Sequence, residues 1–104
     1  MTELVRLGAV EARNRIAAGE IRSVDLVTAC LARIALRDDT IGAWAHLDPA
    51  SAMAQARAAD AAQSAGAVLG PLHGVPVGIK DIIDTADLPT EFGTPVFAGR
   101  RPAT

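Results

Sequence analysis

The residue of this sequence best suited to chemistry is a lysine among apolar neighbours. Lys80 lies in the run Gly74-Val75-Pro76-Val77-Gly78-Ile79-Lys80-Asp81-Ile82-Ile83-Asp84. Lysine is almost never fully buried unless it is paired. Burial disfavours the charged ammonium, so a buried lysine tends toward the neutral amine, which can act as a base. The run therefore predicts either a catalytic lysine or a lysine whose ammonium group reaches solvent.

The apolar residues around Lys80 predict a β-strand over residues 75–83. Successive side chains of a strand point to opposite faces. Both faces are largely apolar here, which is typical of a strand covered on both sides in a parallel or mixed sheet. Gly78 shares a face with Lys80 and leaves an opening there for another chain or a ligand. Asp81 lies on the opposite face, which makes it a poor direct partner for Lys80.

Two other interpretations of Lys80 compete with a catalytic role. In the first, its side chain extends from the end of the strand so that the ammonium group reaches water. In the second, the glycines at every fourth position from Gly66 to Gly78 form a phosphate-binding loop. Such a loop needs a glycine before the lysine and a serine or threonine after it, and neither is present. The solvent-exposed lysine is therefore the stronger alternative.

Other residue types that could do chemistry lack the neighbours they need. Cys30 lies on the apolar stripe of a predicted helix, where a small buried hydrophobic residue is the expected role. No histidine stands nearby to make it a nucleophile. His46 has no second histidine, cysteine or carboxylate at metal-ligand spacing. We therefore expect no metal and no cofactor.

Three helices and one further strand are expected to position Lys80. The first helix covers about residues 9–18, with Gly19 as its stop. Ser23 is predicted to cap the second helix, whose buried stripe holds Val27, Cys30, Leu31 and Ile34. The third begins at Asp48-Pro49 and runs to about residue 64. Alternation over residues 41–47 predicts a short strand.

Composition narrows the classes of function. The formal net charge of -2 offers no basic excess for a nucleic-acid backbone, so no nucleic-acid partner is expected. No run reaches the roughly 18 apolar residues of a membrane span, and no membrane partner is expected. A single cysteine fits a reducing compartment, so the predicted location is cytoplasmic. Aromatic residues are scarce and alanine is abundant, which predicts a thin core that packs against something larger.

Several motifs together resemble the N-terminal part of the amidase signature family. They include the segment from Gly70 to Asp81, with its Gly-x-Pro-x-x-x-Lys-Asp pattern, and the later groups Asp84-Thr85, Leu88-Pro89-Thr90, Gly93-Thr94-Pro95 and Ala98-Gly99. The helical part adds Gly19-Glu20, Ser23-Val24-Asp25-Leu26 and Ala56-Arg57-Ala58-Ala59-Asp60. The resemblance covers nearly the whole chain.

The resemblance implies an amide hydrolase with a Ser–cis-Ser–Lys triad whose lysine is Lys80. Lys80 would take a proton from a bridging serine, which would take one from the nucleophilic serine. The family's Gly/Ser-rich segment, which supplies both serines, has no match here. Ser23, Ser51 and Ser64 lie at helix caps or within helices, and none stands in a Gly-Gly-Ser context. The chain is therefore expected to be inactive alone.

The expected fold class is α/β: N-terminal helices and the first strands of a mixed sheet flanked by helices, incomplete in this chain. Residues 1–104 would form the N-terminal part of one amidase signature domain, with a helical part over 1–66 and the lysine strand and following loop over 67–104. Expected partners are a small-molecule amide and the remainder of the amidase polypeptide, and a homodimer stays open. Alternatives are the A subunit of a tRNA-dependent amidotransferase and a non-catalytic helical interaction module.

Overall fold

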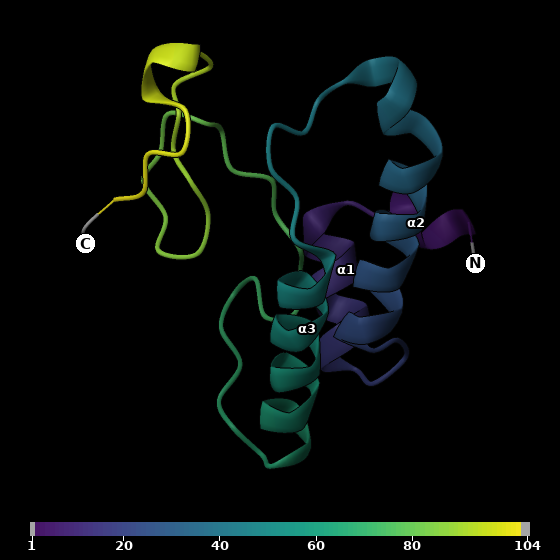
Figure 1. Cartoon of the computed structure of the whole chain (residues 1–104). Helices are drawn as coiled ribbons and strands as arrows, with labels where there is room; N and C mark the ends of the chain where they lie inside the picture. Colours follow the sequence, from purple (N-terminus) through teal and green to yellow (C-terminus); the bar gives the residue numbers. More distant parts are fainter. Residues whose placement is uncertain (1, 103–104) are drawn as a thin grey trace. The chain divides into compact units, whose positions relative to one another are not determined.

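The computed structural model describes residues 2–102, which form helices and irregular segments (Figure 1). In chain order the elements are the 3-10 helix η1 (Thr2–Arg6), the α-helices α1 (Ala9–Ala17), α2 (Ser23–Ile41) and α3 (Pro49–Ser64), and the 3-10 helix η2 (Pro95–Phe97). The chain divides into two compact units. The first comprises the described residues up to Ile41 and Asp48–Pro76, and the second comprises Gly42–Leu47 and the described residues from Val77 onward.

Local capping explains where the helices of the first unit begin. The Asp48 carboxylate accepts the Ser51 N–H at 3.0 Å, and Pro49 occupies the first turn of α3, as predicted. α1 follows Gly8 closely as predicted, and Gly19 beyond its end has φ 77°. The predicted Ser23 cap is wrong, because Ser23 is already the first residue of α2.

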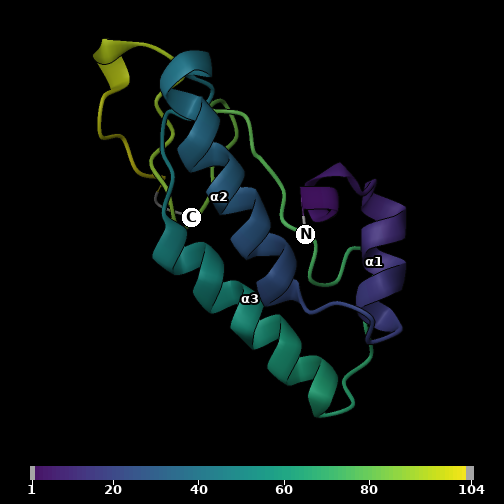
Figure 2. The same cartoon turned by 90° about the vertical axis from the view of Figure 1, so that its right-hand side faces the viewer.

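Packing between α2 and α3 is antiparallel. Figure 2 shows the two helices side by side, and contacts pair the start of α2 with the end of α3. The Ser23 N–H donates to Asp60 Oδ1 at 2.8 Å, and Thr28 Oγ1 lies 3.7 Å from the sulfur of Met53. The alanine-rich α3 contributes Ala56, which is 3% exposed. Small side chains thus let α3 lie close to its neighbour.

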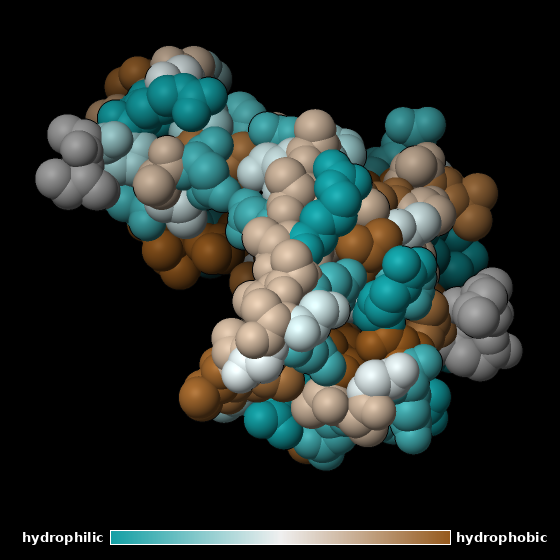
Figure 3. Space-filling view, turned by 90° about the horizontal axis from the view of Figure 1, so that it is seen from below, coloured by the Kyte–Doolittle hydropathy of each residue, from teal (hydrophilic) through white to brown (hydrophobic). Residues whose placement is uncertain are grey.

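The core of the first unit is small and lies where α1 and α2 meet. Its buried members are Ala12, Ile16 and Leu26. Partly buried residues pack around them, namely Leu4, Leu7, Ile21, Cys30 and Val75. The apolar stripe predicted on α2 is the less exposed side of the helix, because Val27 is buried and Cys30, Leu31 and Ile34 are half-buried. The remaining surface carries apolar residues among hydrophilic ones (Figure 3).

The expected mixed sheet is wrong, because no strand forms anywhere in residues 2–102. Ile41 ends α2, and residues 42–47 are irregular rather than a strand. Residues 75–83 are also irregular, and Val77, Ile79, Ile82 and Ile83 are each more than half exposed. A strand satisfies its backbone N–H and C=O groups by pairing with another strand. No segment of the described chain provides that partner, so the apolar pattern alone does not produce a strand.

Among the described residues, no helix combines the length and the apolar composition needed to cross a membrane.

Candidate active site

Lys80 lies in the second unit, at the first position of a tight turn. The Ile83 N–H donates to the Lys80 carbonyl oxygen at 3.0 Å, which closes the turn over Lys80–Ile83. The Lys80 side chain is exposed. Its place differs from the buried strand position expected from the sequence, because the strand is absent. The role of Lys80 as a base stays a prediction.

Asp81 anchors the backbone directly after Lys80. Its carboxylate accepts the Glu91 N–H at 2.8 Å and the Gly93 N–H at 3.3 Å. The Asp81 carbonyl oxygen accepts the Phe92 N–H at 2.9 Å. Three successive N–H groups, those of residues 91–93, therefore all donate to one residue. The Lys-Asp pair of the motif thus combines a lysine with a residue that fixes the following loop.

A second set of contacts ties the loop after the Lys80 turn to the last described residues. Thr90, which is 1% exposed, donates its hydroxyl to the Ile83 carbonyl at 3.2 Å, and its N–H donates to the Arg100 carbonyl at 2.8 Å. The Arg100 guanidinium binds both carboxylate oxygens of Asp84, at 2.8 and 3.4 Å. This donor lowers the pKa of the Asp84 carboxyl and keeps it ionised.

The Glu91 carboxylate joins the 42–47 segment to the rest of the second unit. His46 Nε2 lies 2.7 Å from Glu91 Oε1, and the Gly99 N–H donates to the other carboxylate oxygen. The Gly99 N–H and the His46 ring together lower the pKa of the Glu91 carboxyl. Reasoning from the sequence missed this pair, because 45 positions separate the two residues and no local pattern marks Glu91.

Aromatic side chains fill the remaining space of the second unit. A Cβ at Gly78 would lie 3.2 Å from the Trp44 ring, so the opening expected beside Gly78 is occupied by Trp44. Phe92 and Phe97 meet edge to face with their centroids 5.3 Å apart. The Arg100 guanidinium lies 5.1 Å from the centroid of the Phe92 ring, a cation–π distance.

In the first unit, three hydrogen bonds around Ser23 hold the segment that precedes Lys80 in the sequence. The Ser23 hydroxyl donates to the Gly74 carbonyl at 2.7 Å, and the Asp60 carboxylate accepts the N–H groups of Ser23 and Val24. Gly74 has φ 78°, and a Cβ there would lie 3.2 Å from both Ile16 Cδ1 and Ser23 Cβ. Only glycine fits this backbone and this contact without strain. The Ser23 hydroxyl therefore has a structural role, because it binds the backbone at Gly74.

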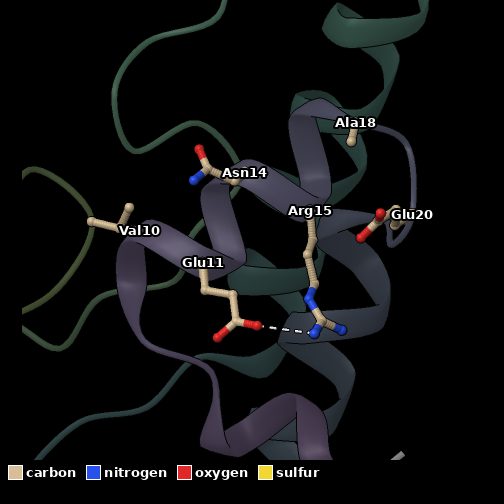
Figure 4. A pocket seen from close by; sticks show the side chains of 6 residues that line it. All are labelled: Val10, Glu11, Asn14, Arg15, Ala18 and Glu20. Carbon is tan, nitrogen blue, oxygen red and sulfur yellow. Dashed lines mark hydrogen bonds and ion pairs between the residues drawn. The ribbon is translucent and has the colours of Figure 1, made fainter.

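A shallow hollow of about 530 Å³ lies along α1, and none of its lining residues is a candidate for catalysis (Figure 4). It is lined by Val10, Glu11, Asn14, Arg15, Ala18 and Glu20. An ion pair between Arg15 Nη2 and Glu11 Oε1, 2.9 Å long, crosses it. Glu11 and Arg15 neutralise one another, Glu20 is the remaining charged residue of the lining, and the lining includes no lysine, histidine or cysteine.

The described residues hold no cluster of three histidine, cysteine or carboxylate side chains that could bind a metal ion. Cys30 packs against the core of the first unit, and burial raises the pKa of its thiol. A thiol held in this way is a weak nucleophile. Lys80 therefore remains the candidate active-site residue, with Asp81 and the Glu91–Gly93 turn as its immediate support.

Comparison with known proteins agrees with the motif around Lys80. A family model described as Amidase matches residues 25–104. The A subunit of the glutamyl-tRNA(Gln) amidotransferase of Chloroflexus aurantiacus is 49% identical over 102 residues, covering 98% of this chain and 21% of that protein. The A subunits of the same name from Thermobifida fusca and Salinispora arenicola are 46% and 43% identical, covering 95% and 98% of the chain and 20% and 21% of their own lengths.

The chain therefore spans about a fifth of the length of the curated relatives it matches. The family match extends over most of the chain and includes the Lys80 motif and the Asp81-centred turn. The chain belongs to the amidase signature family.

Proposed function

We propose that this chain carries the terminal base of an amide-cleaving site, and that this base is Lys80. The observation that carries the proposal is the Gly-x-Pro-x-x-x-Lys-Asp segment, which lies within the residues that match the family. The segment places one lysine on a turn whose flanking backbone is fixed by Asp81. A base needs a defined position relative to the proton it accepts. The turn supports that requirement.

In the proposed reaction, a serine oxygen attacks the amide carbonyl while its proton passes to a bridging serine. The bridging serine gives its own proton to the side-chain amine of Lys80. The C–N bond then breaks, the leaving amine takes the proton back through the relay, and an acyl-enzyme ester remains. Water, deprotonated by the same relay, hydrolyses the ester and releases the acid. Both serines belong to parts of the longer protein outside these 104 residues.

The three serines of this chain have structural contacts or an exposed position, which supports placing the catalytic serines elsewhere. Ser23 donates its hydroxyl to Gly74, and the Ser51 hydroxyl accepts a bond from Gln55 at 3.1 Å. Ser64 is the last residue of α3 and is exposed. We therefore expect the 104-residue chain to show no amide hydrolysis alone.

Replacing the lysine in the longer protein tests the proposal. Lys80→Ala should reduce amide turnover, measured as ammonia released from a simple amide, to a small residual rate. Arg57→Ala, which removes an exposed cation from α3, serves as the matched control and should leave turnover intact. Substantial activity of the Lys80→Ala protein would contradict the assignment and would favour a non-catalytic helical module.

A second candidate function follows from the names of the relatives. Each of the three relatives above is the A subunit of a glutamyl-tRNA(Gln) amidotransferase. The longer protein would then pass the released ammonia to a glutamyl-tRNA bound by a partner protein. The net charge of -2 indicates that this part of the chain would not contact the tRNA itself. Glutamine-dependent formation of glutaminyl-tRNA by the copurified complex would decide for this function over simple hydrolysis.

A further inference from the structure

Asp81 accepts three backbone hydrogen bonds within the second unit, and none of them comes from Lys80. Its two carboxylate oxygens accept N–H groups of Glu91 and Gly93, and its carbonyl accepts that of Phe92. Among the described residues, the carboxylate of Asp81 forms no ion pair with a lysine or arginine. A carboxylate placed among successive backbone N–H groups is a strong, charge-assisted acceptor. Asp81 therefore serves the backbone rather than the ammonium group.

The segment that binds Asp81 adopts an unusual backbone conformation. Phe92 has φ 56°, and Gly93 follows with φ 70°. A phenylalanine in the left-handed region is disfavoured, and such a conformation persists only where its surroundings determine it. The bond from the Phe92 N–H to Asp81, the Phe97 ring and the Arg100 guanidinium provide that determination. The turn over residues 91–93 is thus a fixed mount for Asp81.

We propose that Asp81 is a positioning residue for Lys80: it clamps the backbone after the lysine to the turn over residues 91–93. The inference rests on the proposed role of Lys80 as the base. Adjacent Cα atoms are about 3.8 Å apart and joined by a planar peptide, so a shift of Asp81 is transmitted to Lys80. The turn bond from Ile83 to the Lys80 carbonyl adds a second constraint.

Two substitutions in the longer protein weaken the contacts of Asp81 to different extents. Asp81→Asn keeps one carbonyl-type acceptor for the Glu91 N–H but directs an N–H₂ group at the Gly93 N–H. Asp81→Ala removes both acceptors. Misplacing a catalytic group by about 1 Å costs on the order of 100-fold in rate. We expect kcat to fall about 10-fold in the first variant and about 100-fold in the second, with KM nearly unchanged.

A matched control separates the clamp from the loss of a negative charge. Asp39→Asn removes an exposed carboxylate near the end of α2 and should leave kcat unchanged. Amide hydrogen exchange at residues 91–93 supplies an independent readout. It should accelerate in both Asp81 variants and stay at the wild-type rate in Asp39→Asn. Unchanged exchange in Asp81→Ala would overturn the clamp whatever the kinetics.

A double-mutant cycle distinguishes positioning from simple destabilisation. In a Lys80→Ala background, Asp81→Asn should cause no further loss of the residual rate, because there is no amine left to position. An equal loss in both backgrounds would mean that Asp81 only maintains the folded protein, and would overturn the inference. A wild-type kcat in Asp81→Ala with an inactive Lys80→Ala overturns the positioning role alone. An active Lys80→Ala protein overturns the proposed function and this inference with it.

Discussion

The two units of this chain are stabilised by different interactions. The first unit has three helices around a core in which Ile16 is 1% exposed and Leu26 is 4% exposed. The second unit lacks α-helices within its described residues, and Thr90 is its only buried residue there. Hydrogen bonds and ion pairs converge in it on Asp81, Glu91 and Arg100. Apolar burial thus maintains the first unit, whereas polar contacts of the backbone maintain the one that carries Lys80.

The difference agrees with what each unit is proposed to do. A core of interlocking side chains is stable but leaves little exposed polar backbone. A catalytic amine, by contrast, has to stay accessible while its backbone is held, and hydrogen bonds to flanking residues achieve this. Ile79 and Ile82, which are close to Lys80 in the sequence, are apolar and more than half exposed, and the relatives are about five times as long as this chain.

The largest expected effect is the loss of a core side chain in the first unit. Ile16→Ala should lower the free energy of unfolding by about 2–5 kcal/mol, because it leaves a cavity beside Gly74 and Leu26. Chemical denaturation followed by helical circular dichroism measures it, since α1, α2 and α3 all belong to the first unit. Val10→Ala on the same helix is the control, because Val10 is 74% exposed, and it should change stability by less than about 0.5 kcal/mol. Equal effects of the two substitutions would show that the first unit has no specific core.

A smaller and local effect is expected from a single hydroxyl in the second unit. Thr90→Val keeps the shape of the side chain but leaves the Ile83 carbonyl without its donor. The cost should be about 1–3 kcal/mol in the opening free energy of residues 90–92, measured by amide hydrogen exchange. The helical circular dichroism should not change. Thr85→Val is the control, since that hydroxyl makes only a 3.5 Å contact with Leu88. A global loss of helix in Thr90→Val would contradict the distinction between the two units.

The smallest expected effect is a loss of stability of the second unit at low pH. The folded-state pKa values of Glu91 and Asp84 are lowered by the Gly99 N–H and by Arg100, respectively. Both carboxylates therefore add stability to the second unit above their unfolded pKa values of about 4, and this stability is lost as the pH falls through the folded values. The Gly99 amide signal in NMR should follow Glu91 with a midpoint below about 4.3. Glu91→Gln should abolish that transition, and a wild-type midpoint at or above about 4.3 would contradict the pairing.

Sequence reasoning was most successful where the signals were local. The Asp48-Pro49 start of α3 and the glycine after α1 mark helix ends within a few residues, and both were predicted correctly. The apolar stripe on α2 was likewise identified from its period. These features depend on neighbours three or four positions away, which a single sequence contains.

Features that depend on distant partners were not predicted. Residues 75–83 have the composition of a strand, but a strand also requires a second segment to pair with, and composition does not report on that. The Asp60 carboxylate at the start of α2 and the His46–Glu91 pair each join residues 36–45 positions apart. Lys80 was identified as chemically interesting from its neighbours, yet the clamp formed by Asp81 emerges only when the turn over residues 91–93 is in place.

One substitution tests most directly whether Lys80 acts as a base. Arginine keeps the positive charge but does not lose its proton in proteins, so Lys80→Arg separates charge from basicity. In the longer protein, single-turnover measurement of acyl-enzyme formation should show Lys80→Arg to be as inactive as Lys80→Ala. Acyl-enzyme formation at a rate near that of the wild type in Lys80→Arg would contradict the account, because it would show that Lys80 contributes only its charge.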